Sequence, residues 1–143
     1  MNFANVNFLA IVTAVVAAWI FGAVYYGLLG KAWIAALGET TETLKAKNAG
    51  KSGAVKAAPF ILSFAAELVM AYVLYGLLVH IGTFTVRAGI ISGAFCWFGF
   101  ILTTIAVNNA YPGRKTMLTV IDSGHWLGVL VIIGAIIGWL GMP

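Results

Sequence analysis

Three ionisable side chains stand inside long apolar stretches of this sequence, where a charge is expensive. Glu67 lies in one stretch, and Asp122 and His125 lie in another, three residues apart. That spacing places Asp122 and His125 on one face of a helix. A charged carboxylate at the centre of a membrane helix costs at least about 2.5 kcal/mol on insertion scales. These groups are therefore candidates for binding a solute, relaying a proton or fixing helix packing.

If the apolar stretches cross a membrane in alternate directions, further hydrogen-bonding side chains lie beside this candidate site. With a rise of 1.5 Å per residue, Glu67, Asp122 and His125 lie roughly 9–13 Å from the same side. Tyrosines, threonine and asparagine near the same ends of two other stretches join them, which predicts a polar pocket open to that side. The predicted ligand-binding residues are Glu67, Asp122, His125, Tyr25, Tyr26, Asn108 and Thr104.

The same residues do not match a metal or haem site. Carboxylate and imidazole are acceptable ligands for zinc or iron, but di-metal sites in helical bundles take a second Glu-x-x-His motif. The sequence holds no such motif, and His80 lies too far along its stretch to share one haem iron with His125. We therefore predict no metal, no cofactor and no catalytic residue.

Four long apolar blocks must position these side chains. Of the 143 residues, 62% are hydrophobic and 8% charged, against about 25% charged in a typical soluble domain. Each block is close to the ~20 residues with which a helix crosses a bilayer. We predict an all-α membrane protein, a four-transmembrane-helix bundle forming a single membrane domain over residues 1–143. The predicted spans are about 8–29, 59–80, 86–107 and 116–140.

The longest connection, residues 30–58, predicts a short amphipathic helix in the membrane interface. Trp33, Leu37 and Leu44 fall on one helical face, with Trp33 at headgroup depth. Pro59 is expected at the start of the second span, where its missing N–H costs least. The five lysines of this loop are suited to anionic lipid headgroups beside the bilayer rather than to nucleic acid.

The basic residues also predict the orientation. Loops 30–58 and 108–115 hold seven of the eight Lys and Arg residues, and the other side holds only Arg87. The positive-inside rule then places both loops in the cytoplasm and both termini outside, in a multi-pass protein of the cell membrane.

Glycines four residues apart predict close contacts between helices, because two backbones can approach where side chains are missing. Such contacts are possible within one chain and between chains. The pairs are Gly89 with Gly93, Gly124 with Gly128, and Gly134 with Gly138.

Several short stretches, spread over nearly the whole chain, together form a distinctive pattern. They are Asn5-Val6-Asn7-Phe8-Leu9-Ala10, Gly22-Ala23-Val24-Tyr25-Tyr26, Gly30-Lys31-Ala32-Trp33, Asn108 with Gly113-Arg114, Ile121-Asp122-Ser123-Gly124-His125, and Gly134 with Gly138. The pattern resembles that of a bacterial family of small four-helix membrane proteins, the domain-of-unknown-function family 1761. The resemblance implies a four-helix fold in the bacterial inner membrane, and it implies no activity or ligand.

The chain departs from the family pattern in two stretches that contain candidate site residues. The pattern tends to have Trp-Tyr at Tyr25-Tyr26, and Asn-Ala-Gly-Tyr where this chain has Asp122-Ser123-Gly124-His125. A mechanism shared by the family therefore does not require charge at Asp122 or His125. The departures favour hydrogen bonding or packing as the role of these two residues.

Three hypotheses for function follow, in this order. The first is a non-enzymatic structural or accessory protein that acts by helix packing, as a homo-oligomer or in a larger membrane complex. The second is a transporter or small-ligand carrier in which Glu67 is the proton-labile group. The third is a membrane enzyme acting on a lipid-like substrate, with His125 as the base.

Overall fold

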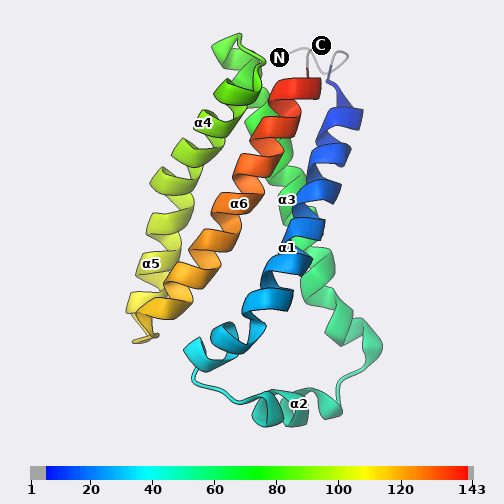
Figure 1. Cartoon of the computed structure of the whole chain (residues 1–143). Coiled ribbons are helices and arrows are strands. Elements are labelled where there is room, and N and C mark those ends of the chain that lie inside the picture. Colours follow the sequence, from blue (N-terminus) through cyan, green and yellow to red (C-terminus); the bar gives the residue numbers. More distant parts are fainter. Residues whose placement is uncertain (1–5, 142–143) are drawn as a thin grey trace.

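The computed structural model describes residues 6–141, and in that range it contains helices and no strand. Consecutive long helices run in opposite directions; the connection 37–52, which contains a short helix, joins the first two, and short loops join the others (Figure 1). Four helices are long and apolar enough to cross a membrane. The predicted all-α, four-helix membrane fold is therefore confirmed. The elements are α1 (Phe8–Ala36), α2 (Thr41–Ala49), α3 (Gly53–Ile81), α4 (Val86–Cys96), the π-helical segment η2 (Trp97–Leu102), α5 (Thr103–Ala110) and α6 (Thr116–Leu140).

Two of the helices extend well beyond the spans predicted for them. α1 continues to Ala36 instead of ending near residue 29, and α3 begins at Gly53, so that Pro59 lies inside the helix and not at its start. A helix of 29 residues is about 43 Å long, against about 30 Å for the hydrocarbon core. Hydropathy predicts the part of a helix that lies in the hydrocarbon core, and both helices are longer than that part.

The short connecting helix is α2, and it begins later than the predicted interfacial helix. Thr40 and Thr43 cap its start reciprocally, and Glu39 accepts a hydrogen bond from Thr43 and forms an ion pair with Lys47. The hydrogen bond from Lys47 lowers the pKa of the Glu39 carboxyl below its ordinary value. None of the α2 residues is buried, so this helix lies on the surface.

Trp33 and Leu37 do not belong to the connecting helix, which corrects the prediction that both lie in it. Trp33 is in the last turns of α1, and Leu37 is the residue that ends this helix. Gly38 follows with φ +78°, a left-handed conformation that glycine adopts without strain and that ends helices. Trp33 therefore belongs to the first long helix, where its indole N–H reaches Asp122 of α6.

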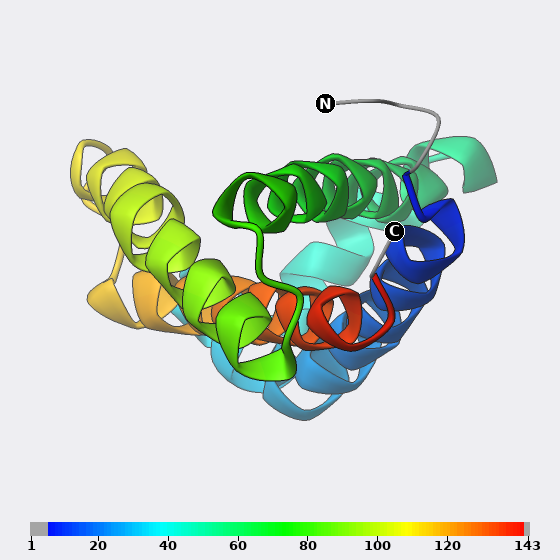
Figure 2. The same cartoon turned by 90° about the horizontal axis from the view of Figure 1, so that it is seen from above.

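The four long helices are not equally buried, and α6 is the central one. It packs against both α1 and α4 (Figure 1). Seen from above, α1, α6 and α4 form a curved layer, and α3 lies against its inner side (Figure 2). The apolar core is made by α1, α3 and α6, with Ala14, Val15, Ala71, Val129 and Ile133 fully buried.

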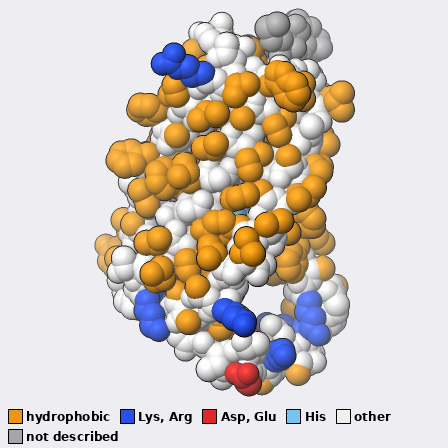
Figure 3. Space-filling model, in the orientation of Figure 1, with side chains coloured by type: hydrophobic (Ala, Val, Ile, Leu, Met, Phe, Trp, Pro, Cys, Tyr) orange, Lys and Arg blue, Asp and Glu red, His pale blue; other side chains and the backbone are white. Residues whose placement is uncertain are grey.

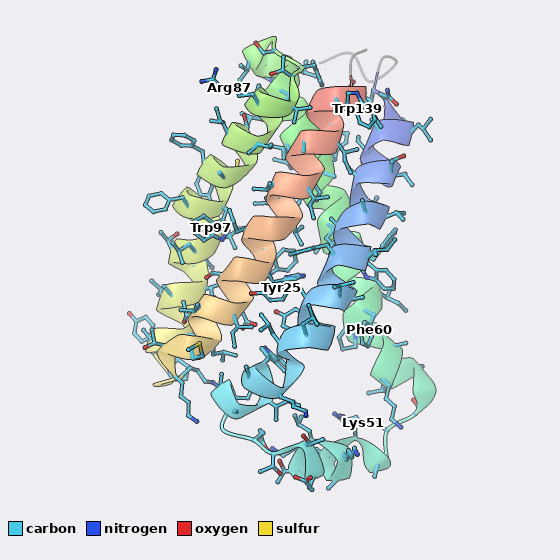
Figure 4. The ribbon with its side chains drawn as sticks, viewed as in Figure 1. Tyr25, Lys51, Phe60, Arg87, Trp97 and Trp139 are labelled. Carbon is cyan, nitrogen blue, oxygen red and sulfur yellow. The ribbon has the colours of Figure 1, made fainter. Side chains whose placement is uncertain are left out.

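One end of the bundle is rich in lysine and arginine, and we call it the basic end. It carries α2 and the loops 37–40, 50–52 and 111–115. Blue side chains gather there in Figure 3, and the sides of the molecule are covered by apolar residues. Arg87 lies at the opposite end (Figure 4). The two loops that were predicted to share a side of the membrane are therefore at the same end of the molecule.

Asn7 links three helices at the end of the bundle that lies opposite the basic end. Its backbone N–H donates to the Tyr75 hydroxyl over 3.2 Å, and its side-chain amide donates to the Leu140 carbonyl over 2.9 Å. Its Oδ1 accepts from the Ala10 N–H and caps α1. One residue thus links the start of α1 to α3 through its backbone and to the end of α6 through its side chain.

The glycine pairs of α4 and α6 bring these two helices into backbone contact. A Cβ added at Gly89 would lie 1.8 Å from the carbonyl oxygen of Gly134, and one added at Gly138 would lie 2.2 Å from the carbonyl oxygen of Thr85. Gly93 faces the Leu130 carbonyl oxygen in the same way. These faces are therefore used inside one chain.

Replacing Gly89 with alanine is expected to push α4 away from α6, because a backbone carbonyl cannot rotate aside. We expect a loss of about 1–3 kcal/mol, the range for overpacked cores, seen as a lower unfolding temperature in detergent. Gly99→Ala in the same membrane span is the control, since nothing lies within 4 Å of a Cβ there. Equal unfolding temperatures for the two variants would contradict the contact.

Candidate functional site

Asp122 is the acceptor at the centre of a polar contact between α1 and α6. Its Oδ1 accepts hydrogen bonds from the Tyr26 hydroxyl and the Trp33 indole N–H, each over 2.9 Å. The neighbouring Tyr25 donates its hydroxyl to the Ile121 carbonyl over 2.9 Å, from the side of α1 that faces α6 (Figure 4). Two donors on a half-buried carboxylate make this a charge-assisted cluster that fixes the register of the two helices.

His125 is enclosed by aromatic rings. Its ring centroid lies 4.9 Å from that of Tyr26, 5.0 Å from Trp126, 5.7 Å from Tyr25 and 6.2 Å from Phe21. The side chain is 6% exposed, and its Nδ1 has no hydrogen-bond partner among residues 6–141. The arrangement packs the imidazole tightly and leaves one ring nitrogen unsatisfied.

Gly22 makes room for the His125 ring. A Cβ at Gly22 would lie 2.8 Å from His125 Nε2, closer than ordinary packing allows. Gly22 is also one turn before Tyr25 and Tyr26 on α1. The glycine and the tyrosines thus form a single site for the imidazole.

Glu67 is the most deeply buried acidic side chain among residues 6–141. It is 1% exposed, and its Oε2 has no hydrogen-bond partner within residues 6–141. It begins the buried stripe of α3 that continues through Ala71, Leu74 and Leu78. The preceding residues 53–62 are all exposed, because α3 diverges from the bundle toward α2 (Figure 1). Glu67 therefore lies where α3 leaves the core.

The sequence predicted that Glu67 lies at the same depth as Asp122 and His125, and the structure contradicts this prediction. Phe64, one turn before Glu67, packs on Trp19 with ring centroids 6.2 Å apart, whereas His125 packs on residues 21–26 of α1. Glu67 is thus further from the basic end. Within the described chain no hydrogen bond joins it to Asp122 or His125.

The structure does not bring Thr104 and Asn108 to this cluster. Both are exposed on α5. The adjacent Asn109 points to α6 instead and donates to the Thr119 hydroxyl over 3.0 Å. One residue corresponds to 100° of helix rotation, so the prediction selected the wrong face of α5. Of the seven predicted site residues, four form one cluster and Glu67 stands apart in the core.

Aromatic rings surround His125, and Glu67 lies apart from it, so these two residues and Asp122 do not form one pocket. A cavity of about 340 Å³ lies instead at the basic end, between the end of α1 and the start of α6. None of the seven predicted residues lines it. Its lining residues are Ala36, Leu37, Gly38, Pro112, Gly113, Arg114 and Lys115.

Sequence reasoning missed Trp33 as a partner of Asp122 and the aromatic residues around His125. The spacing offered a signal, since Gly22, Tyr26 and Trp33 are four and seven residues apart and share a helix face. That signal is visible only if the first helix continues beyond residue 29. Trp97 was taken for an interface anchor or a packing residue, and its indole N–H donates to the Ser123 carbonyl over 2.7 Å.

The fold and these contacts define a small four-helix integral membrane protein with a buried polar cluster. The sequence model of the family described as "Protein of unknown function (DUF1761)" matches residues 9–138. The chain belongs to this family, and the predicted resemblance is confirmed. Asn5, which opens the first resembling stretch, lies outside the described residues. Comparison with curated proteins and with solved structures gave no match.

The role of Asp122 as a hydrogen-bond acceptor predicts that asparagine can replace it. Asp122→Asn keeps an oxygen for Tyr26 and Trp33, so we expect less than about 1 kcal/mol of destabilisation. Asp122→Leu leaves both donors unpaired, and at about 1–3 kcal/mol for each unsatisfied group we expect clear destabilisation. Unfolding in detergent, followed by tryptophan fluorescence, measures both. If asparagine were as damaging as leucine, the charge itself would be needed.

Proposed function

We propose that the protein is a proton-labile carrier of a small polar solute, and that Glu67 is the group whose proton state changes during its work. The observation that carries this proposal is the carboxyl group of Glu67, which is 1% exposed and leaves Oε2 without a partner. An ionisable group inside a membrane bundle marks a solute or proton pathway by default. Burial of a polar atom without a hydrogen bond costs about 1–3 kcal/mol, a cost without benefit in a purely structural role.

The place of Glu67 in α3 supports the same proposal. It lies at the boundary between the exposed segment 53–62 and the packed segment that begins at Ala71. His125, with its unsatisfied Nδ1, is a second buried polar group of the bundle.

The basic end is proposed to face the cytoplasm of a bacterial inner membrane, with both termini outside. The seven basic residues of residues 31–56 and 114–115 support this orientation through the positive-inside rule. The lysines on and around α2 are proposed to meet anionic lipid headgroups. Lys45, Lys51 and Lys56 are all exposed there.

Glu67→Gln and Glu67→Leu test the proposal together. A carrier role predicts that both variants fold and that Glu67→Leu is as stable as the wild type or more stable, because an unpaired polar atom is removed. Infrared spectra of the wild-type protein in liposomes should contain a protonated-carboxyl band that both variants lack. A panel of amines, sugars and amino acids, screened by thermal shift, should yield a solute that stabilises the wild type and neither variant.

Glu42→Gln is the matched control, since it makes the same change at an exposed glutamate of α2. It should leave the carboxyl band and the thermal shift unchanged. A loss of more than about 2 kcal/mol in Glu67→Leu would instead identify Glu67 as a structural hydrogen-bonding group. That result would overturn the carrier proposal.

A second candidate is the accessory role, in which another copy of the chain covers the third span. The most apolar window of the helix 86–110 is only 6% buried, against 44% for α6, which favours a partner on its free side. The glycine pairs no longer support this role, because they are occupied within the chain. Native mass spectrometry from mild detergent should then give dimers, and monomers alone would contradict it. The enzyme hypothesis gains no support, since rings enclose His125.

A further inference from the structure

We infer that the cavity at the basic end is a discrete binding site for a phosphate group, and that an anionic lipid headgroup is its occupant. The site is separate from the exposed lysines of α2 and does not depend on the proposed role of Glu67. It is the space between the end of α1 and the start of α6, where Arg114 and Lys115 contribute the charged part of the lining.

The charge in this cavity is positive and unbalanced. No acidic side chain lines it. The ion pair of the described chain is between Glu39 and Lys47, so Arg114 and Lys115 have no carboxylate partner in residues 6–141. The closest acid along α6 is Asp122, whose Oδ1 already accepts two hydrogen bonds. An anion would therefore balance the positive charge that Arg114 and Lys115 place in the cavity.

The walls of the cavity are held in place. Lys115 Nζ donates to the Ala35 carbonyl over 2.8 Å, which ties the end of α1 to the start of α6 and leaves two ammonium protons for another acceptor. Ala36 packs with Leu118 and Ile121 in a small apolar cluster. A site fixed in advance binds without the cost of ordering its own loops.

The backbone gives the cavity its shape. Gly38 and Gly113 both have positive φ, +78° and +67°, and each turns the chain sharply at a side of the cavity. The space is an open depression at the surface, with a volume of about 340 Å³. It is large enough for a phosphate with a small alcohol attached.

A phosphodiester headgroup suits both the chemistry and the location. Guanidinium groups bind phosphate oxygens in a bidentate manner, and ammonium groups add a point charge. Basic pockets between membrane helices at one surface are the sites where anionic lipid headgroups bind. Met117 and Val120 are exposed and follow Lys115 along α6, which offers apolar surface for acyl chains beside the headgroup.

The test is native mass spectrometry of the full chain in detergent with added phosphatidylglycerol, compared with phosphatidylcholine and with inorganic phosphate alone. Wild-type protein should retain phosphatidylglycerol selectively. Each removed cation near an anionic headgroup is worth about 1 kcal/mol, or about fivefold in affinity. The pair Arg114→Gln with Lys115→Gln should therefore weaken binding by at least about tenfold.

The matched control removes the same charge elsewhere, with Lys45→Gln and Lys51→Gln at exposed positions of α2 and its loop. These lysines are proposed to meet headgroups at the membrane surface and do not line the cavity, so this pair should weaken retention of phosphatidylglycerol clearly less than the Arg114 and Lys115 pair does. Equal weakening by both pairs would mean diffuse attraction to the basic end and would overturn the site, as would equal retention of phosphatidylcholine.

Two further arms keep the result decisive. Arg114→Gln alone leaves the bond between Lys115 and Ala35 intact, so it tests the site if the double variant does not fold, and it should weaken binding by about fivefold. Inorganic phosphate that displaces the lipid from wild-type protein, and does not bind the Arg114 variant, would support the anion site. Phosphate binding in the absence of any lipid binding would overturn the headgroup as its occupant.

Discussion

The close approach of helix backbones is the constraint on which the rest of this bundle depends. Lipid tails are as apolar as leucine, so apolar side chains gain little by leaving lipid for the protein interior. What remains is contact distance and hydrogen bonding. At Gly89 and Gly134, the carbonyl oxygen of one helix occupies the place of a Cβ on the other. The packing of α4 on α6 exists because those side chains are missing.

The same helix uses its other glycines in a different way. Gly124 and Gly128 face α1, and the space that they leave is taken by the Tyr25 hydroxyl and the Phe21 ring instead of by backbone. This contact brings α1 into the register in which Tyr26 and Trp33 reach Asp122. The polar cluster therefore depends on the glycines on the side of α6 that faces α1.

The sequence predicted the number, type and approximate position of the membrane helices, because the length of an apolar block is a direct physical measure of a span. It could not predict where α1 ends, since Lys31 and Trp33 are compatible with either water or headgroups. This one uncertainty had consequences. Because α1 was predicted to end near residue 29, Trp33 was assigned to the surface helix, and its hydrogen bond to Asp122 was not predicted.

The candidate site was predicted in part: Tyr25 and Tyr26 of α1 do meet Asp122 and His125 of α6. The spacing of Asp122 and His125 placed them together, and the structure agrees. Depth along different helices is less well determined, because it depends on where each helix begins and how it crosses its neighbours. Glu67 was assigned to the level of His125 on the assumption of a start at Pro59, and α3 begins at Gly53. The rotation of α5 was likewise open, and Asn109 faces α6 where Asn108 was expected.

The two carboxyl groups inside the bundle, those of Asp122 and Glu67, have opposite hydrogen-bonding environments. Asp122 is half-buried and has a hydroxyl and an indole N–H directed at one of its oxygens. Glu67 is more deeply buried and has an oxygen with no donor among residues 6–141. The bundle therefore supplies donors to one carboxyl group and leaves an oxygen of the other without one. Leucine, of similar size to glutamate, has no polar atom to leave unpaired at position 67. This difference between the two acids is the observation on which the proposed carrier role of Glu67 rests.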